Sequence, residues 1–159
     1  MRKRRNILFM FMGPMFLAAL GGMWSGYLLR TAEIFADDRG GRTMKVVRVY
    51  TGPDNQSHFE DVEIPLKDGG KAGFMSGLMK ATGVVFRETG GDYNFDFHNA
   101  PRRQYVVNLE GEVEIEVGDG TKRILRSGDI LLAEDTTGQG HISRAVGGKP
   151  RKSLFITLD

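Results

Sequence analysis

Short strand-like segments separated by turn residues run from Met44 to the end of the chain, and they constrain its fold more than any other feature. Segments rich in Val, Ile, Phe, Tyr and Thr are bounded by Gly, Asp and Asn, a pattern typical of strands joined by tight turns. We predict strands at 45–50, 58–64, 83–88, 93–98, 103–109, 112–117, 121–126, 130–134, 140–146 and 153–158. A regular series of short strands favours an all-β sandwich or barrel.

Local signals support this interpretation. Strand 112–117 alternates between glutamate and aliphatic residues, which indicates one wet face and one dry face. Residues 118–120 (Gly-Asp-Gly) and 127–129 (Ser-Gly-Asp) are predicted to be tight turns, because glycine adopts positive φ angles at no steric cost. The glycine-rich residues 66–80 are predicted to form a loop or a lid over a pocket.

Charge divides the chain at residue 43. Residues 1–43 hold seven Lys or Arg and three Asp or Glu, a net charge of +4, whereas residues 44–159 carry a net charge of −2. The mildly acidic second part has no basic stripe, which argues against a nucleic-acid partner. The chain has no cysteine, so disulfides, zinc–thiolate sites and a thiol nucleophile are excluded.

Residues 1–43 are predicted to be a basic and hydrophobic appendage to a domain at 44–159. After a basic start, residues 7–29 carry no charge, enough for a helix of roughly 34 Å that spans a bilayer. The basic flank would keep the N-terminus in the cytoplasm and place the domain on the non-cytoplasmic side. Two alternatives are a signal peptide cleaved after Ala36 and a dispensable extension, with translation from Met44 giving a cytoplasmic protein.

The spacing of residues 98–141 resembles the cupin superfamily. His98 stands at the first histidine of the first cupin motif, Ala100 replaces the second histidine, Gln104 replaces the glutamate, and Gly111 follows at the expected distance. In the second motif His141 lies two residues later than in the family pattern. The resemblance implies a cupin-type double-stranded β-helix (jelly-roll) barrel after the N-terminal hydrophobic helix, often assembled as a homodimer.

Cupin pockets hold a divalent metal on histidines and a glutamate. The resemblance therefore implies that His98, Gln104 and His141 converge as a degenerate site for Fe, Mn, Ni or Zn. Catalytic roles are predicted for His98, His141 and Glu134, where Glu134 or Asp135 would orient the ring of His141. The predicted substrate-binding residues are Arg102, Arg103 and Asn108.

Three functions remain open at the level of the sequence. The first is a metal-assisted or histidine-based isomerase, lyase or oxygenase acting on a small organic acid or carbonyl compound. The second is a ligand-binding or sensing cupin that binds without turnover and without metal. The third is a structural barrel that mainly dimerises.

Overall fold

The structure is a computed structural model and describes residues 41–158. In this range it contains strands, turns and one short 3-10 helix, η1 (Gly70–Ala72), and no α-helix. The strands are β1 (Arg42–Thr51), β2 (Ser57–Asp68), β3 (Phe74–Met75), β4 (Gly83–Thr89), β5 (Asn94–His98), β6 (Gln104–Glu110), β7 (Val113–Glu116), β8 (Lys122–Leu125), β9 (Ile130–Glu134), β10 (His141–Ala145) and β11 (Arg151–Thr157). Each predicted strand is present, and only the two-residue β3 was not predicted.

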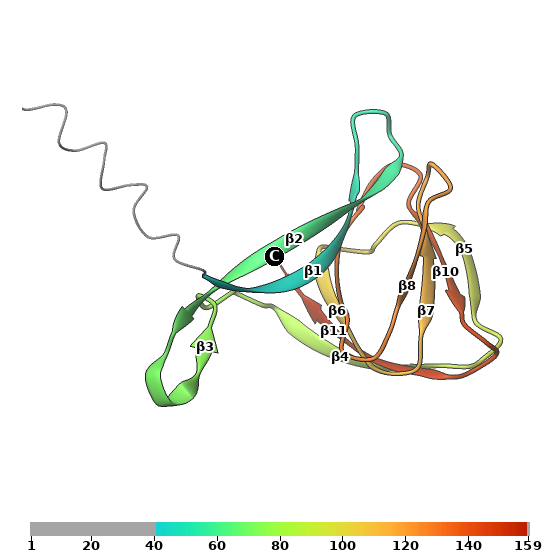
Figure 1. Cartoon of the computed structure of the whole chain (residues 1–159). Helices are drawn as coiled ribbons and strands as arrows, with labels where there is room; N and C mark the ends of the chain where they lie inside the picture. The colour runs from blue at the N-terminus through green and yellow to red at the C-terminus, as the bar shows by residue number, and fades with distance from the viewer. Residues whose placement is uncertain (1–40, 159) are drawn as a thin grey trace, which may run out of the picture. The chain divides into compact units, whose positions relative to one another are not determined.

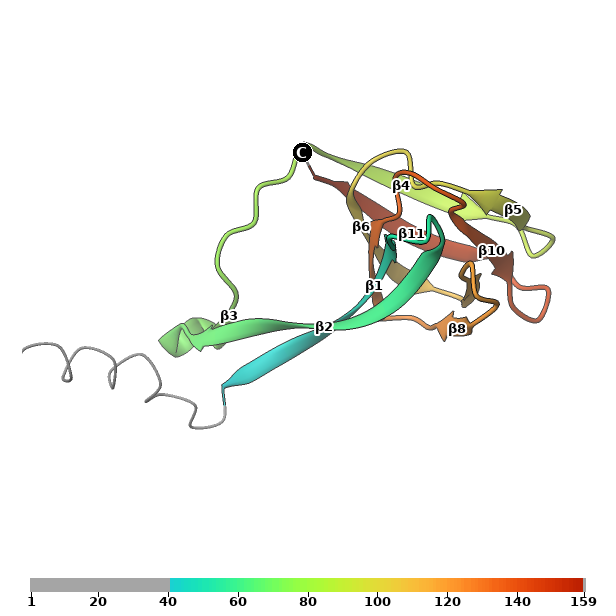
Figure 2. The ribbon, with the colours of Figure 1, turned by 90° about the horizontal axis from the view of Figure 1, so that it is seen from above.

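The strands form two sheets that face each other in a barrel-like arrangement (Figures 1 and 2). The larger sheet has the order β3-β2-β1-β9-β6-β11-β4, and the smaller sheet has the order β5-β10-β7-β8. The buried core joins them, because Val106 and Leu131 of the larger sheet belong to one cluster with Val113 and Ile115 of the smaller sheet. The alternation predicted for strand 112–117 is confirmed, since Val113, Ile115 and Val117 are fully buried.

Two of the turns depend on glycine as predicted. Gly120 closes the β7–β8 hairpin with a φ of 83°, and Gly128 adopts 91° between β8 and β9. Both angles lie in the left-handed region that other residues adopt only with strain. These turns set the register that keeps the aliphatic side of β7 in the core.

The hairpin of β1 and β2 extends away from the barrel, with β3 paired to its outer part (Figure 1). The ring of Phe74 lies 4.1 Å from the guanidinium carbon of Arg42, a cation–π contact within this extension. The segment 66–80 therefore completes an extended hairpin instead of forming only a loop.

The predicted helix at 7–29 lies outside the described residues. Within residues 41–158, no helix is both long enough and apolar enough to cross a membrane. The first strand begins at Arg42, two residues before the predicted domain start at Met44. The predicted homodimer stays a prediction.

Candidate functional site

A pocket of about 550 Å³ lies between the two sheets. Its wall is largely apolar, with Val106 and Leu131 from the larger sheet and Ile115 from the smaller one. Polar side chains project into the same space from β4, β5, β6, β10 and β11. None of residues 66–80 lines it, and Phe74 and Met75 of that segment pair with β2, so the lid stays a prediction.

Two histidines meet in this pocket because β5 and β10 are paired. The Cα atoms of His98 and His141 are register partners in this antiparallel pair, which brings their ring centroids to 4.5 Å. The ring of Phe95 stacks on His98 with a centroid distance of 3.8 Å and an interplanar angle of 21°. Strand pairing and stacking together fix the two imidazoles against each other.

His141 and Asp135 form a buried pair. The Nδ1 atom of His141 lies 2.5 Å from Oδ2 of Asp135, and the Asp135 side chain has no exposed surface. An ionised carboxylate only accepts hydrogen bonds, so Nδ1 carries the proton, and in the neutral ring Nε2 presents a lone pair. The other carboxylate oxygen of Asp135, Oδ1, has no hydrogen-bond partner within residues 41–158. The carboxylate therefore acts on one group only, the ring of His141.

His98 is held as a neutral acceptor. Its Nδ1 lies 2.7 Å from the backbone carbonyl of Asp96, which can only accept, so Nδ1–H donates and Nε2 carries the lone pair. Burial lowers the pKa of His98 below its usual value and outweighs the hydrogen bond to the carbonyl of Asp96, which raises it. Two unprotonated Nε2 atoms therefore belong to neighbouring rings, and a ligand that donates a hydrogen bond would satisfy them.

The backbone before His141 requires glycine. Gly140 has a φ of 76°, and a Cβ atom there would lie 2.2 Å from the carbonyl oxygen of His98. This close approach lets the segment that carries His141 lie directly against the segment that carries His98. Ser57 secures it from the other side by donating to the carbonyl of Gly140 at 2.6 Å.

Asn99 is a positioning residue that the sequence analysis did not identify. Its Nδ2 lies 3.2, 2.7 and 3.1 Å from the carbonyl oxygens of Asp135, Thr137 and Gly138. Because Asn99 directly follows His98, these hydrogen bonds hold the loop before His141 close to His98. An asparagine directly after a predicted ligand was the only available signal.

Gln104 lies in the same pocket as the two histidines. It is 94% buried, and its amide has no hydrogen-bond partner among residues 41–158. An amide without a protein partner at the wall of a cavity is satisfied there by a ligand or by solvent. The three side chains predicted as metal ligands thus line one cavity, whereas their binding of a metal stays a prediction.

The other predicted site residues divide between pocket and exterior. Arg102 lines the pocket at an exposed position. Arg103 lies outside, where its Nη2 is 2.6 Å from Glu134. Asn108 also lies outside the pocket lining, because its side chain is buried and donates to the carbonyl of Leu125 at 2.9 Å.

Glu134 does not reach either histidine. Its oxygens bind Arg48 and Arg103 on the outer face of β9, each at 2.6 Å. Leu131 and Ala133 line the pocket, so strand alternation turns Glu134 outward and brings Asp135 inward. The geometry thus favours Asp135 over Glu134 as the carboxylate that orients His141.

The donor set fits a divalent metal poorly. His98, Gln104 and His141 would supply only neutral donors, and no Asp or Glu of the described residues lines the cavity. Among residues 41–158, no three His, Asp or Glu side chains are grouped so as to hold a metal ion. Two arginines, Arg87 and Arg151, face the same cavity and add positive charge. Such a field disfavours a second cation.

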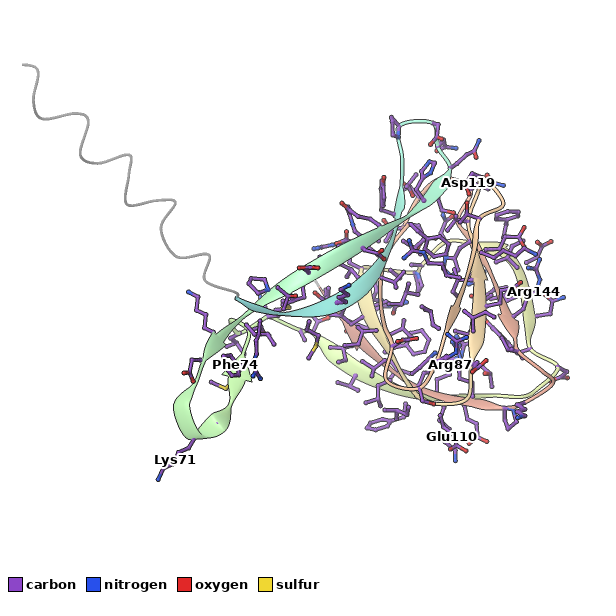
Figure 3. The ribbon with its side chains drawn as sticks, viewed as in Figure 1. Lys71, Phe74, Arg87, Glu110, Asp119 and Arg144 are labelled. Atoms are coloured by element: carbon purple, nitrogen blue, oxygen red, sulfur yellow. The ribbon has the colours of Figure 1, made fainter. Side chains whose placement is uncertain are left out.

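Arg87 and Arg151 were not predicted as site residues. They come from β4 and β11, and the ring of Tyr93 lies beside both. Figure 3 shows Arg87 within the outline of the barrel, whereas Arg144 lies at its outer side. Strand alternation was the available signal, because Arg151 shares an inward face with Phe155 and Thr157.

Comparisons with known proteins add little to this geometry. No protein-family model matches the chain, and no curated protein matches it. Solved structures similar to it include three bacterial proteins. They are the conserved SPY1581 protein of unknown function from Streptococcus pyogenes (17% identity, 52% of this chain and 68% of that chain, TM-score 0.40), protein NMB1881 from Neisseria meningitidis (16%, 51% and 79%, 0.39), and a putative ethanolamine utilization protein Q from Salmonella typhimurium (15%, 74% and 98%, 0.39). At these TM-scores the similarity assigns neither a family nor a function.

Proposed function

We propose that this domain is a cupin-type jelly-roll barrel that binds a small carbonyl compound and moves a proton on it, as an isomerase does. The observation that carries the proposal is the buried pair of His141 and Asp135, joined at 2.5 Å with Nε2 left for the pocket. A carboxylate that holds one imidazole tautomer makes the opposite nitrogen a stronger base. The resemblance of residues 98–141 to the cupin motifs supports the assignment of the barrel.

The proposed step is a proton transfer that balances within the substrate. His141 Nε2 takes the proton from the carbon next to the carbonyl, and the electron pair of the broken C–H bond forms an enolate. The imidazolium then returns the proton to the same carbon, which restores the carbonyl compound. His98, whose Nε2 is an acceptor, receives a hydrogen bond from a hydroxyl group of the substrate. Nothing is oxidised or reduced.

A metal at His98, Gln104 and His141 is the second candidate, and one observation favours it. Both histidines engage their Nδ1 atoms, with Asp96 and Asp135, in the way that metal-bound histidines commonly do. A bound divalent ion would polarise the substrate carbonyl. The uncharged donor set and the two pocket arginines count against this candidate.

Hydrogen exchange on the substrate tests the function without knowledge of the natural reaction. The full chain is incubated in D₂O with small neutral ketones, aldehydes and oxo acids, and the loss of each C–H signal is followed by NMR. We expect exchange with at least one compound, and a decrease of roughly 100-fold or more in Asp135→Asn and His141→Asn. Metal analysis of the same preparation, before and after chelation, separates the two candidates.

The control variant is His58→Asn. His58 lies 2.9 Å from Asp54 in an exposed pair of the same type, far from the pocket lining. It should leave the exchange rate unchanged. Binding without exchange would replace the enzyme with a sensing function, and exchange that survives His141→Asn would exclude His141 as the base.

A further inference from the structure

Two arginines converge in the pocket without a carboxylate partner. Arg151 is 94% buried, and among residues 41–158 neither Arg87 nor Arg151 forms an ion pair or a side-chain hydrogen bond. A guanidinium stays protonated in proteins, so burial cannot be relieved by loss of its proton. A buried charge of this kind is normally paired. The pair is therefore incomplete without a further group.

Aromatic rings hold these guanidiniums in place. The Cζ atom of Arg87 lies 5.1 Å from the ring centroid of Tyr93 and 5.4 Å from that of Phe155. The Cζ atom of Arg151 lies 5.9 Å from the same tyrosine ring. Cation–π contacts fix the position of a guanidinium but leave its N–H donors free. Two sets of donors thus face the cavity beside one ring.

The rest of the lining reinforces the positive field. Arg102 adds a third guanidinium at an exposed position of the lining, and no Asp or Glu side chain from the described part of the chain lines the cavity. The one nearby carboxylate, Asp135, is engaged by His141. A positive cavity with apolar walls selects an anion that also carries an apolar or uncharged part.

We propose that Arg87 and Arg151 bind a carboxylate group, so that the ligand of this pocket is a small organic acid. Planar carboxylates match the fork of a guanidinium through two parallel hydrogen bonds. Arg151 begins β11 and Thr157 ends it, so the two residues lie at opposite ends of this strand. Thr157 is the register partner of Gln104 in the β11–β6 pair. The acid group therefore binds at one end of the cavity, and the remainder of the molecule extends towards the histidines. This inference rests on the proposed small-molecule function and specifies its substrate class.

Calorimetry on the full chain tests the inference with matched probes. Benzoate and benzamide have nearly the same shape and differ in charge. We expect wild type to prefer benzoate, and Arg151→Met or Arg87→Met to weaken benzoate binding by about 10- to 100-fold, because hydrogen bonds to a charged group are lost. Benzamide binding should not change. Arg144→Met removes an arginine from the same barrel outside the pocket lining and should alter neither affinity.

Thermal unfolding provides a second readout. Replacement of a buried unpaired charge by an apolar side chain should raise the unfolding midpoint of the ligand-free protein. A purely structural arginine would give the opposite sign. A lower midpoint in Arg151→Met with unchanged benzoate affinity would overturn the inference.

Other outcomes separate this inference from the proposed function. Failure of wild type to bind acetate, succinate or benzoate would overturn the inference, as would tighter binding of inorganic phosphate than of any carboxylate. Carboxylate binding through Arg151 without C–H exchange would support the inference and refute the proposed proton transfer. Equal exchange on neutral ketones and oxo acids that Arg151→Met does not affect would support the proposed proton transfer and refute the inference of a carboxylate-binding pair.

Discussion

Two pairs of arginines on this barrel have opposite surroundings. On the outer face, Arg48 and Arg103 share Glu134, with nitrogen–oxygen distances of 2.6 Å. Inside the pocket, Arg87 and Arg151 share the ring of Tyr93 and no carboxylate. The outer pair is complete and contributes to stability, whereas the inner pair costs free energy until an anion binds. The comparison shows that the partners of a charged residue, and not its type, distinguish a structural role from a binding role.

Tyr93→Glu should abolish the difference between the two pairs and have the largest effect. A carboxylate near the place of the ring would pair with Arg87 and Arg151 and compete with the ligand. We expect benzoate affinity to fall by roughly 100-fold or more, measured by calorimetry. Tyr93→Phe keeps the ring and should retain most of the affinity. Wild-type benzoate binding by Tyr93→Glu would contradict the assignment of the inner pair.

Glu134→Gln should weaken the outer pair and leave the pocket intact. The substitution removes the negative charge and one of the two acceptor oxygens that the arginines share, although both arginines are partly exposed. We expect the free energy of unfolding, measured by urea denaturation, to fall by about 1–2 kcal/mol. Benzoate affinity should stay within experimental error. A large loss of benzoate affinity would show that Glu134 contributes to ligand binding in the pocket.

The stability difference between wild type and Glu134→Gln should depend on pH. Burial opposes the ionisation of Glu134, yet the hydrogen bonds from Arg103 and Arg48 hold its pKa below the ordinary value of 4.5. The unfolded chain therefore binds more protons than the folded chain in this range, and stability falls as the pH falls. The difference should be fully present above about pH 5 and shrink as the pH drops below 4.5. Denaturation at pH 7 and pH 3.5 checks the sign.

Arg126→Met should give the smallest effect. Arg126 lies 3.5 Å from Glu112 in an exposed pair, with side chains 65% and 40% accessible. Such a pair is screened by water, so the free energy of unfolding should change by no more than about 0.5 kcal/mol. A decrease in the free energy of unfolding as large as that of Glu134→Gln would show that burial does not determine how much an ion pair on the outer face contributes to stability.

The fold was largely predictable because its signals are local. Alternation within strands such as 112–117 and glycine in the turns are read from a few neighbouring residues, and the predicted strands are present. The two-residue β3 was missed because its pairing with β2 is set by tertiary structure. Residues 66–80 contain too many glycines for a strand to be predicted from the sequence.

The site was predictable only where a spaced motif marked it. His98, Gln104 and His141 were singled out by their resemblance to family positions, and they line one cavity. Arg87 and Arg151 are 64 residues apart on strands that pair in register only after folding. An arginine in a strand is ordinarily assigned to the solvent face, although alternation along β11 places Arg151 on the same face as Phe155 and Thr157. Alternation along β9 would have separated Asp135 from Glu134 if it had been applied to the end of the strand.

The side chain of Asn99 couples the local unfolding of the two segments that carry the histidines. Its Nδ2 donates to the carbonyl groups of Asp135, Thr137 and Gly138. These hydrogen bonds connect the segment that carries His98 to the segment that carries His141. The backbone amide of Ala100 donates to the carbonyl of Asp135 at 3.2 Å and connects the same two segments. Segments tied in this way open together and not one at a time. His141 and His98 therefore belong to one cooperative unit, whose local unfolding would dismantle the pocket in a single event.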